Sequence, residues 1–404
     1  MTNVTNIISQ TSTSGIATSV DIAICGAGPV GLALAGLLAK RGVAPERIAL
    51  LDARPLEQAR SDPRSIALSY GSSQIFQEIG AWPIAASTIR QIHVSRRGHF
   101  GRTLIDSAQY DLPALGYVTR YGVLVEALAR ASTNAGIGSL RPASVTTLIE
   151  EEQQVRLQLA TGETLTARIV VQAEGGVFGD QADKVRSRDY RQTAIVAQIG
   201  VSAPLPQRAF ERFTDEGPLA LLPQTNEEDA SPSRQKTNYA LVWCMRPATA
   251  ARLMALPDAA FLHALEQAFG SRVGRFLQVS PRSTFSLGLN ADPALTNRTV
   301  AIGNAAQTLH PVAGQGLNLG LRDAAVLARL LAQAPTPEML QRFIGERQTD
   351  RNLTIRMTDL MARVFASAPD GALSQTLLGL SLGAIDAFKP ARRLLAEQMM
   401  FGQR

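Results

Sequence analysis

The sequence predicts a mixed α/β protein with a Rossmann-like doubly wound sheet, an inserted antiparallel sheet and a helical C-terminal region. The N-terminal part supplies the first observation. A short apolar strand over 20–25, a helix over 32–40 and a second apolar strand over 47–51 follow one another there. Alternating strands and helices of this length are typical of a parallel sheet covered by helices.

The second observation lies about 250 residues further on. The run 298–302 is β-branched and apolar and is followed at once by Gly303, so it predicts a buried parallel strand. A Gly/Pro-rich loop then leads into a helix from Leu317, whose apolar residues recur at helical spacing until Pro335 ends the run. The two ends of the chain are therefore expected to build one cofactor domain.

Strand-like runs between about 190 and 287 supply the third observation. They include 193–201 and 238–244, with one helix near 259–269, and they predict the inserted sheet that would bind the substrate. The expected division has four parts: a flexible tail over 1–19; a cofactor domain over 20–82, 104–183 and 288–335; a substrate domain over 83–103 and 184–287; and a helical region over 336–404.

The N-terminal strand–helix–strand unit carries a dinucleotide fingerprint. Gly26 permits a tight turn, Gly28 allows a pyrophosphate to approach the backbone, and Gly31 allows the helix to pack closely on the strand. Pro29 lies in the same loop, between Gly28 and Gly31. Asp52 ends the second strand, 21 residues after Gly31, where it can accept hydrogen bonds from a ribose.

The loop over 311–316 indicates a second part of the same site. Its glycines let the backbone come close to a flat ligand, and the helix that follows directs its N-terminal N–H groups and positive dipole at that ligand. A cofactor that becomes an anion on reduction, as a flavin does, suits such a place.

Together these motifs resemble the single-component FAD-dependent aromatic hydroxylases, and within them the ubiquinone-biosynthesis hydroxylases, with 2-polyprenyl-6-methoxyphenol hydroxylases as the nearest subgroup. The similarity runs from about Asp21 to the C-terminus. Asn304, where most relatives carry Asp, points to that subgroup. Further matching segments are 62–69, 92–98, 115–118, 190–195, 211–223 and 388–396.

The resemblance implies FAD as cofactor, O2 as co-substrate and a prenylated phenol as substrate. In such enzymes the flavin, reduced by NAD(P)H or another donor, forms a hydroperoxide whose distal oxygen attacks the aromatic ring. It implies an FAD site built by the following residues, with no catalytic residue assigned: Gly26, Gly28, Pro29, Gly31, Asp52, Arg64, Glu174, Asn304, Pro311, Gly314, Gln315, Gly316, Leu317 and Asn318.

One departure from the family pattern concerns the electron donor. The usual Ala-Asp-Gly motif reads Ala173-Glu174-Gly175 here, and Phe178 stands where relatives carry Ser. This puts binding of the nicotinamide donor in question more than binding of the flavin. Two alternative functions therefore stay open: a flavin dehydrogenase or reductase of the same fold, and a flavin-bound, non-catalytic assembly subunit.

Several residues have plain structural alternatives. Asp52 could cap its strand, Asn304 could hold a turn and Arg64 could be a surface charge. His310 lies in the signature loop, but we expect it to shape that loop rather than react. On the substrate side the sequence offers only guesses, which are Tyr239, Glu211 and Arg212.

Composition narrows the class and the partners. The 404 residues are 45% hydrophobic, enough for a large core in two or more domains. The net charge of +6 is spread along the chain without an aromatic-interleaved basic stripe, which argues against nucleic-acid binding. Cys25 and Cys244 lie in apolar runs and are expected to be core thiols, and the four histidines show no metal-ligand spacing.

Membrane contact is expected at most at the surface. No run reaches the roughly 18 apolar residues of a spanning helix, so the protein is expected at most to lie on a membrane. The two cysteines in apolar runs suit the reducing cytoplasm, which is the expected compartment. The apolar, then basic segment 377–393 could lie on the inner face of the membrane, although packing on the cofactor domain or between two copies of the chain is the favoured interpretation. Other ubiquinone-biosynthesis proteins are further candidate partners.

Overall fold

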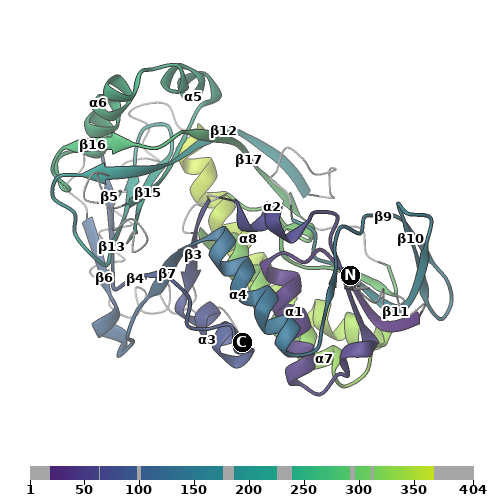
Figure 1. The fold of residues 1–404 in the computed structure, drawn as a ribbon. Coiled ribbons are helices and arrows are strands. Elements are labelled where there is room, and N and C mark those ends of the chain that lie inside the picture. The colour runs from purple at the N-terminus through teal and green to yellow at the C-terminus, as the bar shows by residue number, and fades with distance from the viewer. Residues whose placement is uncertain are drawn as a thin grey trace, which may run out of the picture.

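The computed structural model describes most of the chain, namely residues 19–62, 64–97, 102–175, 186–224, 239–291, 296–310 and 314–367. These residues form three sheets with helices around them (Figure 1). The expected α/β class with a doubly wound, Rossmann-like part and a separate antiparallel sheet is confirmed. The expected tail up to residue 18 and the segment 377–393 lie outside the described residues.

The first sheet has seven strands and is built from both ends of the chain. Its order is β8-β2-β1-β11-β10-β9, and β18 pairs with β11. The pairs β1–β2, β1–β11 and β11–β18 are parallel, which confirms the buried parallel strand expected before Gly303. The strands are β1 (Ser19–Cys25), β2 (Ile48–Leu51), β8 (Ser139–Leu140), β9 (Val145–Glu150), β10 (Val155–Leu159), β11 (Thr164–Gln172) and β18 (Thr299–Ala301).

Alternating side chains of β1 bury both faces of this sheet. Ile22 and Ile24 pack with α1, α4 and α7 in the largest core cluster, whereas Ala23 and Cys25 pack with residues of β10 on the other face. The helices around this sheet are α1 (Pro29–Lys40), α2 (Leu56–Arg60), α4 (Tyr121–Asn134) and α7 (Gln315–Leu331), with the 3-10 turn η1 (Pro45–Arg47).

The second sheet has eight strands in the order β16-β12-β15-β14-β13-β5-β6, and β17 pairs with β12. All its pairs are antiparallel except β13–β5. Two helices, α5 (Pro247–Met254) and α6 (Asp258–Phe269), pack at this sheet (Figure 1). The strands are β5 (Gln91–Arg96), β6 (Arg102–Asp106), β12 (Arg186–Val201), β13 (Arg208–Phe213), β14 (Pro218–Pro223), β15 (Tyr239–Met245), β16 (Phe276–Val279) and β17 (Ser283–Ala291).

A third, small sheet was not expected from the sequence. It has the order β3-β7-β4 and is antiparallel throughout. Ile89 and Val118 of this sheet pack against Ala209 of the eight-stranded sheet, so it joins the two larger units. Its elements are β3 (Ser65–Ser69), β4 (Ser87–Ile89) and β7 (Gly116–Arg120), flanked by α3 (Tyr70–Glu78) and the 3-10 turn η2 (Ser107–Tyr110).

The C-terminal region is helical, as expected, through α8 (Pro337–Ser367). Buried ion pairs attach α8 to α7: Asp323 on α7 is fully buried and pairs with Arg347 and Arg351 at 2.8 Å each. Within the described ranges, none of the helices combines the length and apolarity needed to cross a bilayer. The division into domains stays a proposal, and β6 runs across the suggested boundary at 103/104.

Both cysteines are buried and unpaired in the described structure, as expected of core thiols. Burial, together with the charge of Glu174, raises the pKa of Cys25 to about 12. Burial likewise raises the pKa of Cys244. Neither thiol is therefore an activated nucleophile.

Candidate functional site

The glycine loop after β1 is shaped by two close contacts. Gly26 has φ of +108°, and a Cβ there would lie 2.6 Å from the backbone of Ala173 at the end of β11. A Cβ on Gly31 would lie only 1.9 Å from the carbonyl oxygen of Gly26. Any side chain at either position would overlap backbone atoms, so the loop can pass between two strands only with glycine.

The N-terminus of α1 is open to a ligand. Gly28 has an extended conformation before the first helical residue, Pro29, and no side chain caps the helix. A Cβ on Gly28 would lie 3.4 Å from the hydroxyl of Tyr121. The uncapped N–H groups of a first helical turn attract anions, so this end of α1 suits a phosphate.

Asp52 is tied to the glycine loop. Its Oδ2 accepts a hydrogen bond of 2.9 Å from the N–H of Ala27, and its Oδ1 accepts one of 2.9 Å from the N–H of Arg54. A carboxylate offers about four lone-pair positions, so acceptor capacity is left for a ribose hydroxyl. The residue is 8% exposed.

Arg141, which the sequence reasoning missed, completes this corner. Its Nη2 lies 3.5 Å from Oδ2 of Asp52 and also donates to the carbonyl oxygen of Ala27. Its buried Nε has no hydrogen-bond partner among the described residues. The only signal in the sequence is that Arg141 follows β8, which lies beside β2 at the edge of the same sheet.

Arg64 lies beside the start of α1 and makes a bidentate pair with Asp62. Its Nη2 is 2.6 Å from Oδ2 of Asp62, and its guanidinium carbon lies 5.1 Å from the ring centre of Tyr121. Burial alone would raise the pKa of Asp62, but the hydrogen bonds and charge of Arg64 hold it below its usual value. Through Tyr121, the structure brings Arg64 near Gly28.

Glu174 follows β11 and reaches the same corner. A Cβ on Gly26 would lie 2.6 Å from its backbone nitrogen. Partial burial and, secondly, the charge of Asp52 raise the pKa of the Glu174 carboxyl. Phe178, the other departure from the family pattern, lies outside the described residues.

The C-terminal motif docks directly onto α1. Gly303 has φ of +61°, and a Cβ there would lie 3.1 Å from Val30 on α1. Gly320 on α7, which the sequence reasoning missed, packs against the same turn, since its Cβ would lie 2.8 Å from the Cα of Gly303. Asn304 belongs to the 3-10 turn η4 (Gly303–Ala305) and is thereby held next to the glycine loop.

The N-cap residue of α7 has a left-handed backbone conformation, and the first turn of the helix is uncovered at Gly316. Gly314 has φ of +60° at the N-cap, and a Cβ there would lie 3.2 Å from Ala67 on β3. Gln315 is buried and Leu317 packs against the main core. By contrast, a Cβ on Gly316 would meet nothing within 4 Å. Pro311 lies outside the described residues.

The side-chain amide of Asn318 is bonded within the protein. Its Oδ1 accepts from the Ser69 N–H at 2.8 Å and the Ser72 hydroxyl at 2.7 Å. Its Nδ2 donates to the carbonyl oxygens of Ala67 and Gly314. These four bonds use the donors and the oxygen of the amide, so the side chain holds the start of α7 against β3 and α3.

His310 is buried and shapes its loop, in keeping with its expected role. Its Nε2 lies 2.9 Å from Oε1 of Gln192, whose own Nε2 donates to the carbonyl oxygen of Glu216. Burial lowers the pKa of His310 to about 4. The ring is therefore neutral near pH 7 and donates from Nε2.

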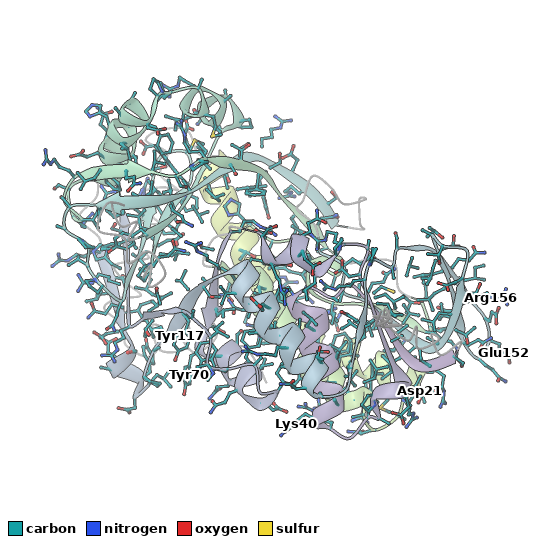
Figure 2. All side chains as sticks on the ribbon, viewed as in Figure 1. Asp21, Lys40, Tyr70, Tyr117, Glu152 and Arg156 are labelled. Atoms are coloured by element: carbon teal, nitrogen blue, oxygen red, sulfur yellow. The ribbon has the colours of Figure 1, made fainter. Side chains whose placement is uncertain are left out.

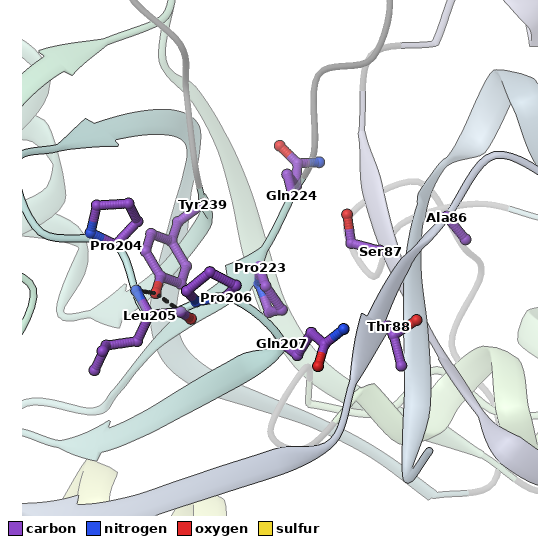
Figure 3. A pocket seen from close by; sticks show the side chains of 10 residues that line it. All are labelled: Ala86, Ser87, Thr88, Pro204, Leu205, Pro206, Gln207, Pro223, Gln224 and Tyr239. Carbon is purple, nitrogen blue, oxygen red and sulfur yellow. Dashed lines mark hydrogen bonds between the residues drawn. The ribbon is translucent and has the colours of Figure 1, made fainter. Parts of the chain in front are cut away.

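Two of the three substrate-side guesses have structural partners. The hydroxyl of Tyr239 accepts from the Leu205 N–H at 2.9 Å and donates to the Leu205 carbonyl oxygen at 3.0 Å (Figure 3). Nε of Arg212 donates to the carbonyl oxygen of Ala268 on α6 at 3.1 Å. Glu211 shows no hydrogen-bond partner among the described residues.

A pocket of about 290 Å³ opens at one end of the eight-stranded sheet (Figure 3). Its lining is more apolar than polar and comes from β4 and from the ends of β13, β14 and β15. The lining residues are Ala86, Ser87, Thr88, Pro204, Leu205, Pro206, Gln207, Pro223, Gln224 and Tyr239.

Comparison with known proteins decides the family. A family model described as an FAD binding domain matches residues 19–352. The ubiquinone hydroxylase UbiL of Rhodospirillum rubrum is 32% identical over 394 residues, which cover 94% of this chain and 89% of that protein. The 3-demethoxyubiquinol 3-hydroxylase of Escherichia coli K12 is 30% identical over 328 residues, covering 78% and 80%.

The chain belongs to the FAD-dependent hydroxylase family. Among solved structures, the aromatic hydroxylase CabE from angucycline biosynthesis has the same fold, with a TM-score of 0.68 and 22% identity over 94% of this chain and 76% of that one. The protein is an FAD-dependent aromatic hydroxylase, an oxidoreductase of the monooxygenase type that uses FAD and O2.

The residues of this hydroxylase fit FAD. The uncapped start of α1 suits the pyrophosphate, and the free acceptor capacity of Asp52 beside the unpartnered Nε of Arg141 suits the adenosine end. Among the described residues, none would contact a Cβ on Gly316, so the start of α7 is uncovered at this point. The contact between Gly303 and Val30 holds the two halves of this arrangement together.

Proposed function

We propose that the protein hydroxylates the aromatic ring of a polyprenylated phenol in ubiquinone biosynthesis. The observation that carries the proposal is the similarity to two ubiquinone-pathway hydroxylases at 30% identity or more, over most of both chains. Bound FAD, once reduced by a donor, would supply activated oxygen. All other roles in the proposal belong to residues of the chain.

The proposed FAD site has two halves. Gly26, Gly28, Pro29, Gly31 and Asp52 would bind the ADP part through the start of α1 and the end of β2. The start of α7 would hold the flavin ring, because its N-terminal dipole favours negative charge on the reduced ring. The residues assigned to that second half are Asn304, Pro311, Gly314, Gln315, Gly316, Leu317 and Asn318, with Arg64 and Glu174 at the border.

Asn318 and His310 are proposed as positioning residues. Asn318 would fix the distance between the start of α7 and β3 through its four hydrogen bonds. The loop that contains His310, between β18 and α7, is called the flavin loop below. His310 would hold this loop against β12 through Gln192.

The pocket at the end of the eight-stranded sheet supports a prenylated substrate. Pro204, Leu205, Pro206 and Pro223 present apolar surface there, as an isoprenoid chain requires. The aromatic head would then lie deeper along the same sheet, towards the proposed flavin site.

The test is aerobic turnover under ¹⁸O₂. Purified protein reconstituted with FAD and a reductant would be supplied with a short-chain prenylphenol, and the product analysed by mass spectrometry. The proposal predicts one labelled oxygen atom in a hydroxylated ring. Reoxidation of the flavin without label in the ring, under conditions where the flavin is reduced, would favour a dehydrogenase or reductase, and bound flavin with no redox turnover would favour an assembly subunit.

A further inference from the structure

The two faces of the eight-stranded sheet differ in what covers them. On one face, Arg212 donates to the carbonyl oxygen of Ala268, and the ring of Phe210 lies 5.5 Å from that of Phe269, so this face packs on α6. Side chains alternate along a strand, so Glu211, between Phe210 and Arg212, projects from the opposite face. That opposite face is called the inner face below.

Strand register shows what surrounds Glu211 on the inner face. Glu211 is opposite Val94 on β5 and Ala220 on β14, and the same row continues through β15 and β12. Residues directly opposite one another in a sheet share a face. From β5 to β12 the other side chains of this row are apolar: Val94, Ala220, Val242 and Val196. The row ends at Thr103 on β6 and Ser283 on β17.

The inner face borders the proposed flavin site. Gln192, on this face of β12, contacts His310 of the flavin loop at 2.9 Å. Phe285, which is opposite Ala194 on the same face, lies 6.0 Å from the guanidinium carbon of Arg64. At its other end the face packs against the small β3-β7-β4 sheet through Ala209. Along the strands, Glu211 thus lies between the row of Gln192, which contacts the flavin loop, and the end of the sheet where the pocket opens.

The carboxyl of Glu211 is poised to take up a proton. Burial raises its pKa to about 7, and no neighbouring charge contributes to that shift. The thiol of Cys244 lies two strands away on β15, and its own pKa is raised by burial and by Glu211. Arg96 lies on the inner face of β5 beside Phe213, one row away.

Other groups in this region are already engaged or face elsewhere. The hydroxyl of Tyr239 is bonded twice to Leu205, and the amide of Gln192 is bonded to His310 and Glu216. Arg212 projects towards α6. Among the described residues, Oε1 of Gln224 at the pocket also lacks a hydrogen-bond partner, but it is a neutral amide oxygen. Glu211 therefore provides the carboxylate on this part of the inner face.

We propose that Glu211 is the catalytic base that accepts the hydroxyl proton of the phenol substrate; this inference rests on the proposed hydroxylation. In that step the phenolic O–H bond breaks, its electron pair stays on the phenolate oxygen, and a new O–H bond forms on the Glu211 carboxylate. The phenolate pushes electron density into the ring, which makes the ring carbons ortho and para to the oxygen better nucleophiles.

The test compares Glu211→Gln with the wild-type holoenzyme over a range of pH. A general base contributes about 100- to 10,000-fold, so kcat/KM for a short-chain prenylphenol should fall by that factor near pH 7.5. The wild-type decline below about pH 7 should be absent from the variant. Activity of the variant should rise again towards pH 10, where about half of a phenol is ionised in solution.

Two variants control for folding and for position. Glu266→Gln changes a carboxylate on α6, at the opposite face of the same sheet, and should keep the wild-type pH profile. Glu211→Asp keeps the acid and should recover part of the lost activity. Glu211→Gln should unfold at the same temperature as the wild type or higher, because it removes a buried charge.

A binding measurement separates this inference from the proposed function. The wild type should bind a prenylphenol more tightly than its methyl ether, and Glu211→Leu should reduce that preference at least fivefold. If the wild type forms labelled product while Glu211→Gln keeps its kcat/KM and pH profile, Glu211 is not the base. If no phenol is hydroxylated, the proposed function is wrong. If the wild type also binds the phenol and its methyl ether equally, Glu211 is not the acceptor of the phenol proton either.

Discussion

The Oδ2 atom of Asp52 accepts a hydrogen bond of 2.9 Å from the backbone N–H of Ala27, 25 residues earlier in the chain. This bond joins the end of β2 to the glycine loop after β1. Arg141 approaches both residues from β8, so the acid, the loop and a buried cation form one unit. The geometry of the proposed adenosine site therefore depends on the Asp52 carboxylate.

Replacing Asp52 should weaken FAD binding more than it weakens the fold. In Asp52→Asn the negative charge opposite Arg141 is lost. One carboxylate oxygen is replaced by an amide NH2 donor, and the single oxygen that remains cannot serve both Ala27 and a ribose. We expect FAD affinity to fall about 10- to 100-fold, equivalent to about 1.4–2.8 kcal/mol, as measured by titration of flavin fluorescence.

Asp21 offers a matched control for this substitution. It lies near the start of β1, far along the strand from the glycine loop, and pairs with Arg47 (Figure 2). Asp21→Asn should leave FAD affinity unchanged. Equal loss of affinity in both variants would show that general destabilisation, and not the carboxylate at position 52, is responsible.

Gly31 should tolerate no side chain. A Cβ there would lie 1.9 Å from the carbonyl oxygen of Gly26, so Gly31→Ala must displace α1 from β1. We expect the free energy of unfolding, measured by urea denaturation, to fall by about 1–3 kcal/mol, the usual range for overpacking. Gly138→Ala is the control, because a Cβ at Gly138 meets nothing within 4 Å; a similar loss in both would contradict the packing account.

The buried His310 should make stability depend on pH. Its folded-state pKa of about 4 lies below the value of 6.5 in the unfolded chain, so the unfolded state binds the proton first as pH falls. The contribution of neutral His310 to the free energy of unfolding is complete above about pH 6.5. It falls as the pH is lowered to about 4, by about 3 kcal/mol in total. His310→Gln should flatten the dependence of unfolding free energy on pH in this window.

His263 provides the comparison for that experiment, because it is exposed on α6. His263→Gln should retain the wild-type slope between pH 6.5 and 4. A wild-type slope in His310→Gln as well would mean that carboxylates elsewhere, and not His310, set the pH dependence in this range.

Asp323 should be the residue whose loss most weakens the attachment of α8. Asp323→Asn removes the negative charge between Arg347 and Arg351 and leaves two cations with reduced compensation in the interior. Breaking a buried pair in this way costs about 3–5 kcal/mol, which thermal and chemical unfolding would detect. Glu346→Gln, in an exposed pair with Arg329, should cost about 0–1 kcal/mol; the reverse order would refute the role of the buried network.

Local patterns made the glycine loop predictable from the sequence. The turn at Gly26, the helix start at Pro29 and the strand end at Asp52 lie within one βαβ unit, where spacing determines geometry. The same holds for the strand before Gly303 and for α7. The sequence also predicted that these two distant segments build one site, because their motifs together resemble those of one family.

Contacts between distant segments were not predictable in the same way. Three of the four partners of Asn318 lie about 250 residues away on β3 and α3, and nothing near Asn318 in the sequence indicates those bonds. Arg141 is isolated in sequence from the acid that it contacts. The small sheet was missed because β3 and β4 are short and pair with β7, which lies about 30 to 50 residues further along the chain.

The most direct test of a flavin site assembled from both ends of the chain is an FAD titration of the wild type and Gly316→Val, with Gly345→Val as control. A Cβ at either glycine meets nothing within 4 Å in the structure, so both variants should fold. The wild type and Gly345→Val should bind one FAD per chain, and Gly316→Val should bind it at least about tenfold more weakly, or about 1.4 kcal/mol. Wild-type FAD affinity in Gly316→Val, or no FAD binding by the wild type, would contradict the account.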